Sequence, residues 1–121
     1  MASKYLRVVT DQKFYNVISI HSRTSRKSKN LAKIFNIPKM YLSIDSMLED
    51  PNLDAVIVAV SYENVFKITK KVLSKKIPVL IEKPVGLSSQ EANILMEIAK
   101  KNNIKNMVGL NRRFYSNFIK G

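Results

Sequence analysis

Four polar segments hold the side chains with which this chain of 121 residues could do chemistry, and each follows a short apolar run. They are residues 21–24 (HSRT), 61–64 (SYEN), 82–84 (EKP) and 109–113 (GLNRR). Their side chains offer hydrogen-bond donors and acceptors and charges of both signs. One such segment is weak evidence, because loops are polar in most proteins. Four of them in equivalent positions indicate a binding site.

The apolar runs before these segments predict strands. They are rich in β-branched residues and cover residues 16–20, 55–60, 79–81 and 107–108. The run 55–60 (AVIVAV) is apolar at every position. A continuous apolar run of this kind is typical of a strand that is covered on both faces of a sheet.

Between the expected strands, apolar residues recur with the spacing of amphipathic helices. In residues 63–76 they fall at i, i+3, i+4, i+7 and i+8, and the lysines lie largely off that stripe. Ser88 and Glu91 have the spacing of a capping box, which opens a helix that runs to about Asn102. Further helices are expected at residues 2–11, 25–36 and 44–49.

Helices that alternate with strands require crossover connections, so the sequence predicts an α/β fold with a parallel sheet and flanking helices. In an open parallel sheet, ligands bind outside the carboxyl ends of the strands. The four polar segments would therefore meet along one edge of the sheet.

Composition excludes several classes of protein. Apolar residues make up 45% and charged residues 25% of the chain, as in ordinary globular domains. The chain has no cysteine and one histidine, which excludes disulfides, a thiolate metal site and a histidine-rich metal cluster, so no metal site is predicted. No apolar run approaches the roughly 20 residues of a membrane span, and the N-terminus lacks a signal pattern. A cytoplasmic location fits these features.

The formal net charge of +12 has two explanations. A basic excess can indicate a nucleic acid or anionic membrane as partner. Alternatively, lysine is the default surface residue of this protein, which we favour because most basic residues are lysines and asparagine is also abundant. The lysines are spread over several helices without interleaved aromatic residues, so a nucleic-acid partner is not expected.

Three blocks of sequence resemble the N-terminal domain of the glucose–fructose oxidoreductase / inositol dehydrogenase / rhizopine-catabolism (Gfo/Idh/MocA) family. They are residues 50–60 (DPNLDAVIVAV), 78–85 (PVLIEKPV) and 107–114 (MVGLNRRF), within a resemblance that spans residues 1–118. It implies a Rossmann-like domain that binds NAD or NADP, and in complete relatives a larger domain that binds the small-molecule substrate and forms homo-oligomers. The implied reaction is hydride transfer to or from a sugar, cyclitol or related hydroxy compound.

The resemblance assigns a catalytic role to Lys83. The lysine of the family's Glu-Lys-Pro motif lies beside the nicotinamide and the reacting carbon of the substrate, where a cation stabilises charge during hydride transfer. Glu82 would contact the cofactor, and Pro84 resembles a proline whose preceding bond is often cis. Without these neighbours, Lys83 would be interpreted as a solvated lysine at a strand end.

Four further residues are assigned to the cofactor by resemblance. Asn111 and Arg112 match an Asn-Arg pair that lines the cofactor and substrate side. Ser61 and Asn64 lie where the family often has Thr-Pro and, a few residues on, a histidine. The chain departs from this pattern, because Tyr62 replaces the proline.

Ser22 and Arg23 are predicted to bind the ribose end of the cofactor. An NAD-preferring domain usually has a carboxylate here, which bonds the ribose hydroxyls. This chain has a hydroxyl and a guanidinium instead, and arginine suits a 2′-phosphate. We therefore expect NADP to be favoured over NAD. The alternative is that Arg23 is a surface residue at a helix start.

The family's opening strand and its Gly-x-Gly-x-x-Gly turn have no counterpart in the sequence. The only glycines are Gly86, Gly109 and Gly121, and all follow the first expected helix. The absent strand would lie between the strands at 16–20 and 55–60, so a gap is expected there. We expect residues 1–121 to form one partial nucleotide-binding domain, truncated and without a C-terminal substrate domain. The function is then either that of an oxidoreductase domain or that of a non-catalytic remnant or accessory module.

Overall fold

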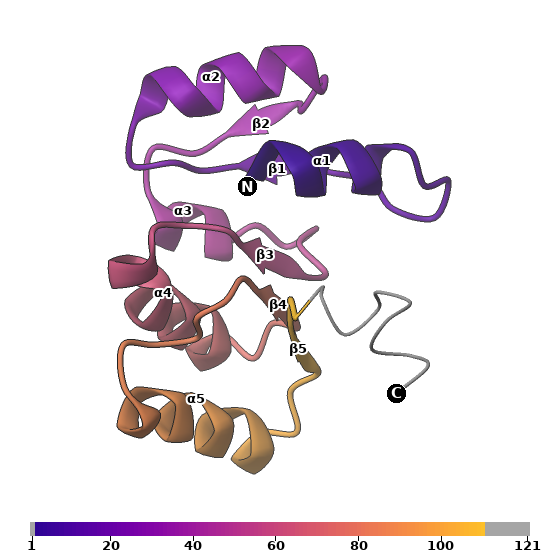
Figure 1. Ribbon diagram of the computed structural model, residues 1–121. Coiled ribbons are helices and arrows are strands. Elements are labelled where there is room, and N and C mark those ends of the chain that lie inside the picture. Colours follow the sequence, from indigo (N-terminus) through magenta and orange to yellow (C-terminus); the bar gives the residue numbers. More distant parts are fainter. Residues whose placement is uncertain (1, 111–121) are drawn as a thin grey trace, which may run out of the picture. The chain divides into compact units, whose positions relative to one another are not determined.

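The computed structural model describes residues 2–110, which form two compact units that divide between Leu53 and Asp54. Each unit is a parallel sheet with helices, and in each a helix connects every pair of neighbouring strands (Figure 1). The α/β, Rossmann-like fold predicted from the alternation of strands and helices is therefore confirmed. Among residues 2–110, the longest helices have 13 residues, and no helix meets the length and apolarity needed to span a bilayer.

The first unit contains a two-stranded sheet, in which Ser19 pairs with Lys39 and Ile20 with Met40. Its elements are α1 (Ala2–Thr10), β1 (Ser19–Ile20), α2 (Ser25–Ile34), β2 (Lys39–Met40) and α3 (Ile44–Leu48). Helix α2 packs on β2. The apolar core of the unit is small: Ile37, Met47 and Leu48 are buried, and α1 contains no buried residue.

A buried carboxylate ties β2 to the segment after α3. The Asp50 side chain is 1% exposed, and its Oδ2 accepts hydrogen bonds from Lys39 Nζ at 2.9 Å and Tyr41 Oη at 2.7 Å. Its Oδ1 accepts a bond from the backbone N–H of Asn52 at 3.0 Å. The bond from Lys39, followed by those from Asn52 and Tyr41, lowers the pKa of Asp50 from 3.8 to about 2. The ionised form of Asp50 therefore stabilises the folded unit.

We expect Asp50→Asn to destabilise the protein at neutral pH, and the loss to shrink in acid. Because the folded-state pKa of Asp50 lies below 3.8, its contribution is present above about pH 4 and disappears as the pH falls toward about 2. Urea unfolding of parent and variant between pH 7 and pH 2 measures the difference. The exposed Asp54→Asn is the control, with little change expected at any pH. If the difference in the free energy of unfolding between parent and variant did not change with pH, this role for Asp50 would be contradicted.

The second unit contains a three-stranded parallel sheet in the order β3-β4-β5. Its elements are β3 (Val56–Val58), α4 (Tyr62–Ser74), β4 (Val79–Ile81), α5 (Ser89–Lys101) and β5 (Asn106–Val108). Val56 pairs with Val79, which pairs in turn with Asn106. Both helices lie on the same side of the three strands, and α4 packs on α5 as well as on β3 and β4 (Figure 1).

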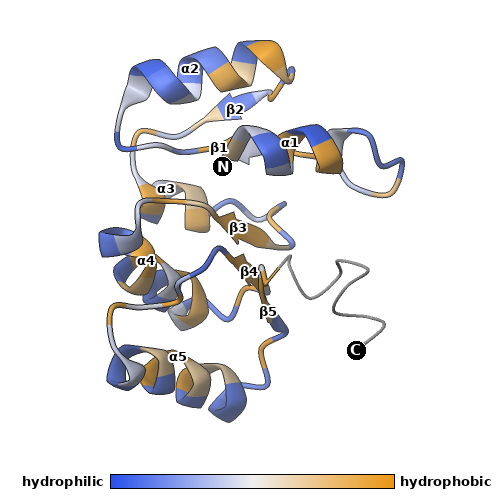
Figure 2. Cartoon of the chain, in the orientation of Figure 1, coloured by the Kyte–Doolittle hydropathy of each residue, from blue (hydrophilic) through white to orange (hydrophobic). Residues whose placement is uncertain are grey.

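The core of this unit lies between the sheet and the two helices. Strands β3 and β4 are hydrophobic along their whole length (Figure 2), and alternate residues point toward the helices. The residues of this core are each at most 6% exposed: Val56, Val58, Val65, Val72, Leu73, Val79, Ile81, Leu95 and Ala99.

Three sequence predictions about the strands were incomplete or wrong. Strand β2 was not predicted, because Lys39 and Met40 form no apolar run. The strands expected at 16–20 and 55–60 are shorter, at Ser19–Ile20 and Val56–Val58. The expectation that the run 55–60 is covered on both faces is wrong in the described structure, because Ile57 is 39% exposed.

The described strands form two separate sheets. Strand β1 pairs only with β2, and β3 pairs only with β4, so no described strand joins the two sheets. Edge strands are usually protected by charged residues or proline. Strand β3 has neither, since it consists of Val56, Ile57 and Val58. Its sequence is that of a central strand, although it lies at an edge.

Candidate functional site

The carboxyl edge of the β3-β4-β5 sheet brings two of the four predicted segments together. Beyond the strands, the backbone ladder continues: Glu82 N–H donates to the Val58 carbonyl at 2.9 Å, and Gly109 N–H donates to the Ile81 carbonyl at 2.8 Å. Residues that follow β3, β4 and β5 therefore lie at successive positions along one edge. The segments 61–64 and 82–84 share it, as predicted from the parallel topology.

Ser61 and Asn64 contact each other directly at this edge. Asn64 Nδ2 donates to Ser61 Oγ at 2.8 Å, and Asn64 N–H donates to the Ser61 carbonyl at 2.8 Å. Ser61 is the N-cap of α4, but its hydroxyl makes no capping hydrogen bond to the helix. The Ser61 hydroxyl, which accepts from Asn64, can therefore still donate its proton to a ligand at the positive end of the helix.

The Glu82-Lys83-Pro84 segment crosses the same edge beyond β4. Glu82 is buried, at 8% exposure, whereas Lys83 and Pro84 are exposed. The Lys83–Pro84 peptide bond is cis, as the resemblance implied. An ammonium group on this edge, next to the Ser61–Asn64 pair along the sheet, can hydrogen-bond and stabilise an oxygen that gains negative charge.

A capping box holds the chain between Pro84 and α5. Ser88 Oγ accepts from Glu91 N–H at 3.2 Å, and Glu91 Oε2 accepts from Leu87 N–H at 2.7 Å, so the helix start predicted at Ser88 is confirmed. Gly86 was not singled out from the sequence. A Cβ at this position would lie 2.8 Å from the Glu91 Cβ, too close for any side chain. The signal was a glycine two residues before the capping serine.

The segment 21–24 lies at the carboxyl end of β1, in the first unit. Ser22 Oγ accepts a hydrogen bond from Thr24 N–H at 3.3 Å. Arg23 is exposed, directly before the N-cap Thr24 of α2, and Arg26 is exposed in the first turn of that helix. No acidic residue occupies this turn. His21 Nδ1 bonds the Tyr41 carbonyl at 2.9 Å, and because a carbonyl only accepts, Nδ1 carries the proton. This contact gives His21 a structural role at the end of β1.

Asn111 and Arg112 lie outside the described residues, so their assignment to the cofactor stays a prediction. The roles of Ser22, Arg23, Ser61, Asn64, Glu82, Lys83 and Pro84 also remain predictions. The structure brings the last five together on one edge, and Ser22 and Arg23 belong to the other unit.

Parallel strands, crossover helices and polar residues at the carboxyl ends together define the nucleotide-binding half of a Rossmann-like domain. Comparison with known proteins agrees. Residues 1–110 match the Gfo/Idh/MocA family, described as an oxidoreductase family with an NAD-binding Rossmann fold. The chain belongs to this family.

Two relatives illustrate the similarity. Trans-1,2-dihydrobenzene-1,2-diol dehydrogenase of Xenopus laevis is 31% identical over 101 residues, which cover 84% of this chain and 31% of that protein. Myo-inositol 2-dehydrogenase of Thermotoga maritima is 29% identical over 115 residues, which cover 95% of this chain and 34% of that protein. The chain thus spans about a third of the length of these relatives.

A solved structure shows the same fold. GenD2 from gentamicin A biosynthesis, crystallised in complex with NAD, superposes with a TM-score of 0.93 at 24% identity. The superposition covers 99% of this chain and 34% of that one.

Proposed function

We propose that this chain is the cofactor-binding part of an NAD(P)-dependent oxidoreductase that acts on a secondary hydroxyl of a sugar, cyclitol or related compound. The observation that carries the proposal is the position of Lys83, which follows β4 on the same carboxyl edge as the hydrogen-bonded Ser61–Asn64 pair. The relatives named above are dehydrogenases of a cyclitol and of a cyclic diol, which supports this class of substrate.

The described residues fit one end of a dinucleotide better than its middle. Ser61, Asn64, Glu82 and Lys83 offer hydroxyl, amide, carboxylate and ammonium groups on one edge, which suit the nicotinamide and the substrate. For the pyrophosphate, the family uses backbone amides of a glycine-rich turn. This sequence has no such turn before α1. Tight binding of the whole cofactor therefore requires groups beyond those described.

Lys83 would act on the substrate oxygen. Oxidation of a secondary alcohol removes a hydride from carbon and a proton from oxygen, and a bound dinucleotide would accept the hydride. As the O–H bond breaks, the oxygen gains negative charge, and the Lys83 ammonium stabilises that charge by a hydrogen bond. By resemblance, the group that receives the proton belongs to a substrate-binding domain, through which relatives also form homo-oligomers. The predicted cytoplasmic location is part of the same proposal.

The direct test is an activity assay on the natural polypeptide that contains this chain. With NADP or NAD and a panel of cyclitols, sugars and cyclic diols, the reduced nicotinamide is followed by its absorbance. Dehydrogenation of at least one polyol, with simple alcohols inert, is the expected result. A protein that binds dinucleotide but oxidises no hydroxy compound would overturn the proposal.

We further propose that the cofactor is NADP, and expect Arg23→Gln to weaken its binding at least about tenfold. A hydrogen bond to a charged group contributes about 1.5–3 kcal/mol, and 1.4 kcal/mol is tenfold in affinity. Since NAD lacks the 2′-phosphate, its affinity should change less than about threefold. Titration of the same polypeptide with NADPH and NADH, followed by nicotinamide fluorescence, measures both. Lys33→Gln, near the other end of α2, is the control. Equal affinities of the parent protein for NADPH and NADH, or a higher affinity for NADH, would contradict the proposal that the cofactor is NADP.

A non-catalytic remnant or accessory module is the alternative, and the free edges of β1 and β3 favour it. Unpaired buried backbone groups cost about 1–3 kcal/mol each. Without a glycine-rich turn, residues 1–121 alone should give no measurable heat with NADP or NAD in calorimetry. A polypeptide in which an apolar strand and such a turn precede residue 1 should bind. Tight binding by residues 1–121 alone would contradict the requirement for the turn.

A further inference from the structure

The loop between β4 and α5, residues 82–88, carries Lys83 and is held at both ends (Figure 1). At the β4 end, the Glu82 N–H donates to the Val58 carbonyl at 2.9 Å, and Glu82 itself is buried. Lys83 and Pro84, which come next, are both exposed. The position of Lys83 therefore depends on how the rest of the loop is held.

Glu91, in the first turn of α5, holds the other end of the loop. Its Oε2 accepts a hydrogen bond from the Leu87 N–H at 2.7 Å, and an ionised acceptor makes this bond a strong one. The backbone of Gly86 lies against the same side chain, because a Cβ at position 86 would be 2.8 Å from the Glu91 Cβ and 2.9 Å from its Oε2. These contacts of Glu91 with Gly86 and Leu87 are called the loop clamp below.

Helix α5 is a firm base for the loop clamp, because its inner side belongs to the core. The helix packs on α4, and its residues Leu95 and Ala99 are buried. Val85 of the loop is half-buried and lines the same apolar pocket as Leu95. All of these residues belong to the second unit. The loop clamp therefore fixes the segment after Lys83 to a packed helix of the same unit.

We propose that Glu91 is a positioning residue for Lys83, and that the loop clamp holds the Lys83 ammonium in place at the carboxyl edge of the sheet. The inference rests on the proposed function, in which Lys83 stabilises the substrate oxygen. A lysine side chain is long and flexible, so a mobile backbone beneath it would spread the ammonium over still more positions. A misplacement of about 1 Å can cost about a hundredfold in rate.

A role limited to capping α5 predicts something different, because a capping box has two equivalent halves. Ser88 Oγ accepts from the Glu91 N–H within the helix start, whereas Glu91 Oε2 reaches back to the loop at Leu87. Ser88→Ala and Glu91→Ala each remove one of these bonds, so both should lower the urea midpoint by a similar amount. Only Glu91→Ala releases the loop. Ser88→Ala therefore separates positioning of Lys83 from stability of the helix.

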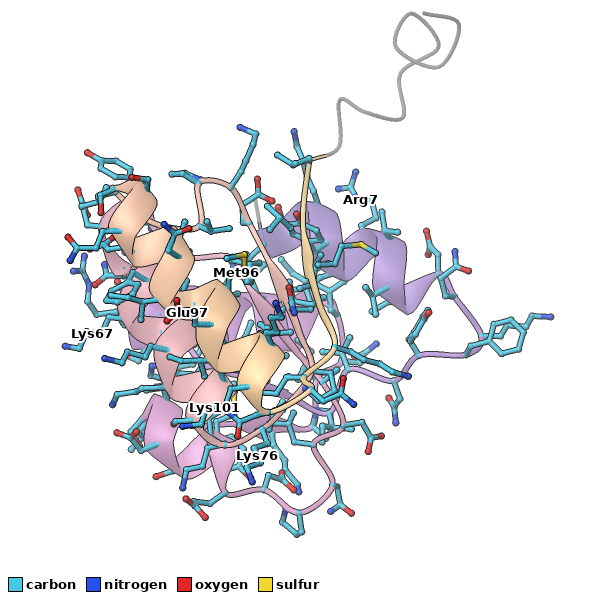
Figure 3. The ribbon with its side chains drawn as sticks, turned by 90° about the horizontal axis from the view of Figure 1, so that it is seen from below. Arg7, Lys67, Lys76, Met96, Glu97 and Lys101 are labelled. Atoms are coloured by element: carbon cyan, nitrogen blue, oxygen red, sulfur yellow. The ribbon has the colours of Figure 1, made fainter. Side chains whose placement is uncertain are left out.

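The activity of the natural polypeptide that contains this chain gives the first measurement. Glu91→Ala should lower kcat about tenfold, with dinucleotide affinity within about threefold of the parent, and Ser88→Ala should change kcat less than about twofold. Glu91→Gln keeps an acceptor oxygen at the same place, so it should retain most of the parent activity. Glu97→Ala, on the exposed side of α5 (Figure 3), removes a carboxylate without touching the loop and should leave kcat unchanged.

A double variant shows whether the effect of Glu91 passes through Lys83. When Lys83→Met is already present, adding Glu91→Ala should lower kcat by less than about twofold, because residues that act as one unit are not additive. A general loosening of the second unit would instead lower kcat by the same factor with and without Lys83. The comparison of these two factors is the readout that a purely structural role would not change.

Hydrogen–deuterium exchange tests the loop clamp without any assay of activity. In Glu91→Ala, peptides spanning residues 82–87 should exchange at least about fivefold faster than in the parent, because the Leu87 N–H loses its acceptor and the loop opens locally. In Ser88→Ala and Glu97→Ala, the same peptides should exchange within about twofold of the parent rate.

Unchanged exchange in Glu91→Ala would overturn the loop clamp, whether or not the polypeptide is active. Faster exchange with an unchanged kcat, an equal loss of kcat in Glu91→Ala and Ser88→Ala, or a full further loss in the Lys83→Met background would each refute the positioning of Lys83. A polypeptide that oxidises no hydroxy compound would refute the proposed function instead. The exchange rates would then still decide whether Glu91 holds the loop.

Discussion

Replacing Lys83 by methionine is expected to lower kcat of the natural polypeptide by a factor of about 10² to 10³, with dinucleotide affinity within about threefold of the parent. This is the usual effect of removing one hydrogen-bond donor that stabilises a developing oxyanion. Lys83 is exposed at the carboxyl end of β4, so its loss removes little packing. Methionine keeps the length and apolar stem of the side chain and removes only the charge.

The matched control is Lys105→Met. Lys105 is also exposed, but it precedes β5 and so lies at the amino edge of the same sheet. Its replacement should change neither kcat nor dinucleotide affinity. Lys83→Arg keeps the charge and should retain more activity than Lys83→Met. Equal kcat values for parent and Lys83→Met, at saturating substrate, would show that Lys83 does not take part in the reaction.

The sequence predicted those elements best whose pattern is local and strong. Helices α4 and α5 were placed within two residues at each end, because an apolar stripe and, for α5, the capping box of Ser88 and Glu91 mark them. Strand β4 was predicted with its observed bounds, Val79–Ile81. The carboxyl edge could also be located from the sequence. Parallel topology places the segments that follow successive strands, residues 61–64 and 82–84, at the same edge of the sheet.

The features that were missed depend on distant neighbours. Strand β2 exists because Lys39 and Tyr41 donate backbone hydrogen bonds to the carbonyls of Ile18 and Ile20, which no local pattern reveals. The Asp50 cluster likewise joins side chains from β2 and from the segment after α3. The exposure of Ile57 depends on which face the helices cover, and an apolar run contains no information about that. Gly86 was missed because its close approach to Glu91 is a packing constraint.

Packing between α4 and the sheet is expected to contribute strongly to the stability of the second unit. Leu73→Ala should destabilise the protein by about 2–5 kcal/mol, out of the roughly 5–15 kcal/mol typical of a native domain. Leu73 is 1% exposed on α4, in the core between the helices and the sheet. Truncation leaves a cavity that surrounding groups fill only in part. Urea unfolding followed by circular dichroism measures the loss.

Two controls separate the cavity from other effects of the substitution. Leu73→Met nearly conserves volume and should cost less than about 1.5 kcal/mol, whereas Lys67→Ala, on the exposed side of α4, should stay within about 0.5 kcal/mol of the parent. If Leu73→Ala were as stable as Lys67→Ala, α4 would not pack on the sheet as described. That packing also positions the residues of the candidate site, because α4 begins next to Ser61 and contains Asn64. A loosened α4 would separate this pair from Lys83, so the core residue Leu73 and the edge residue Lys83 depend on the same contact between helix and sheet.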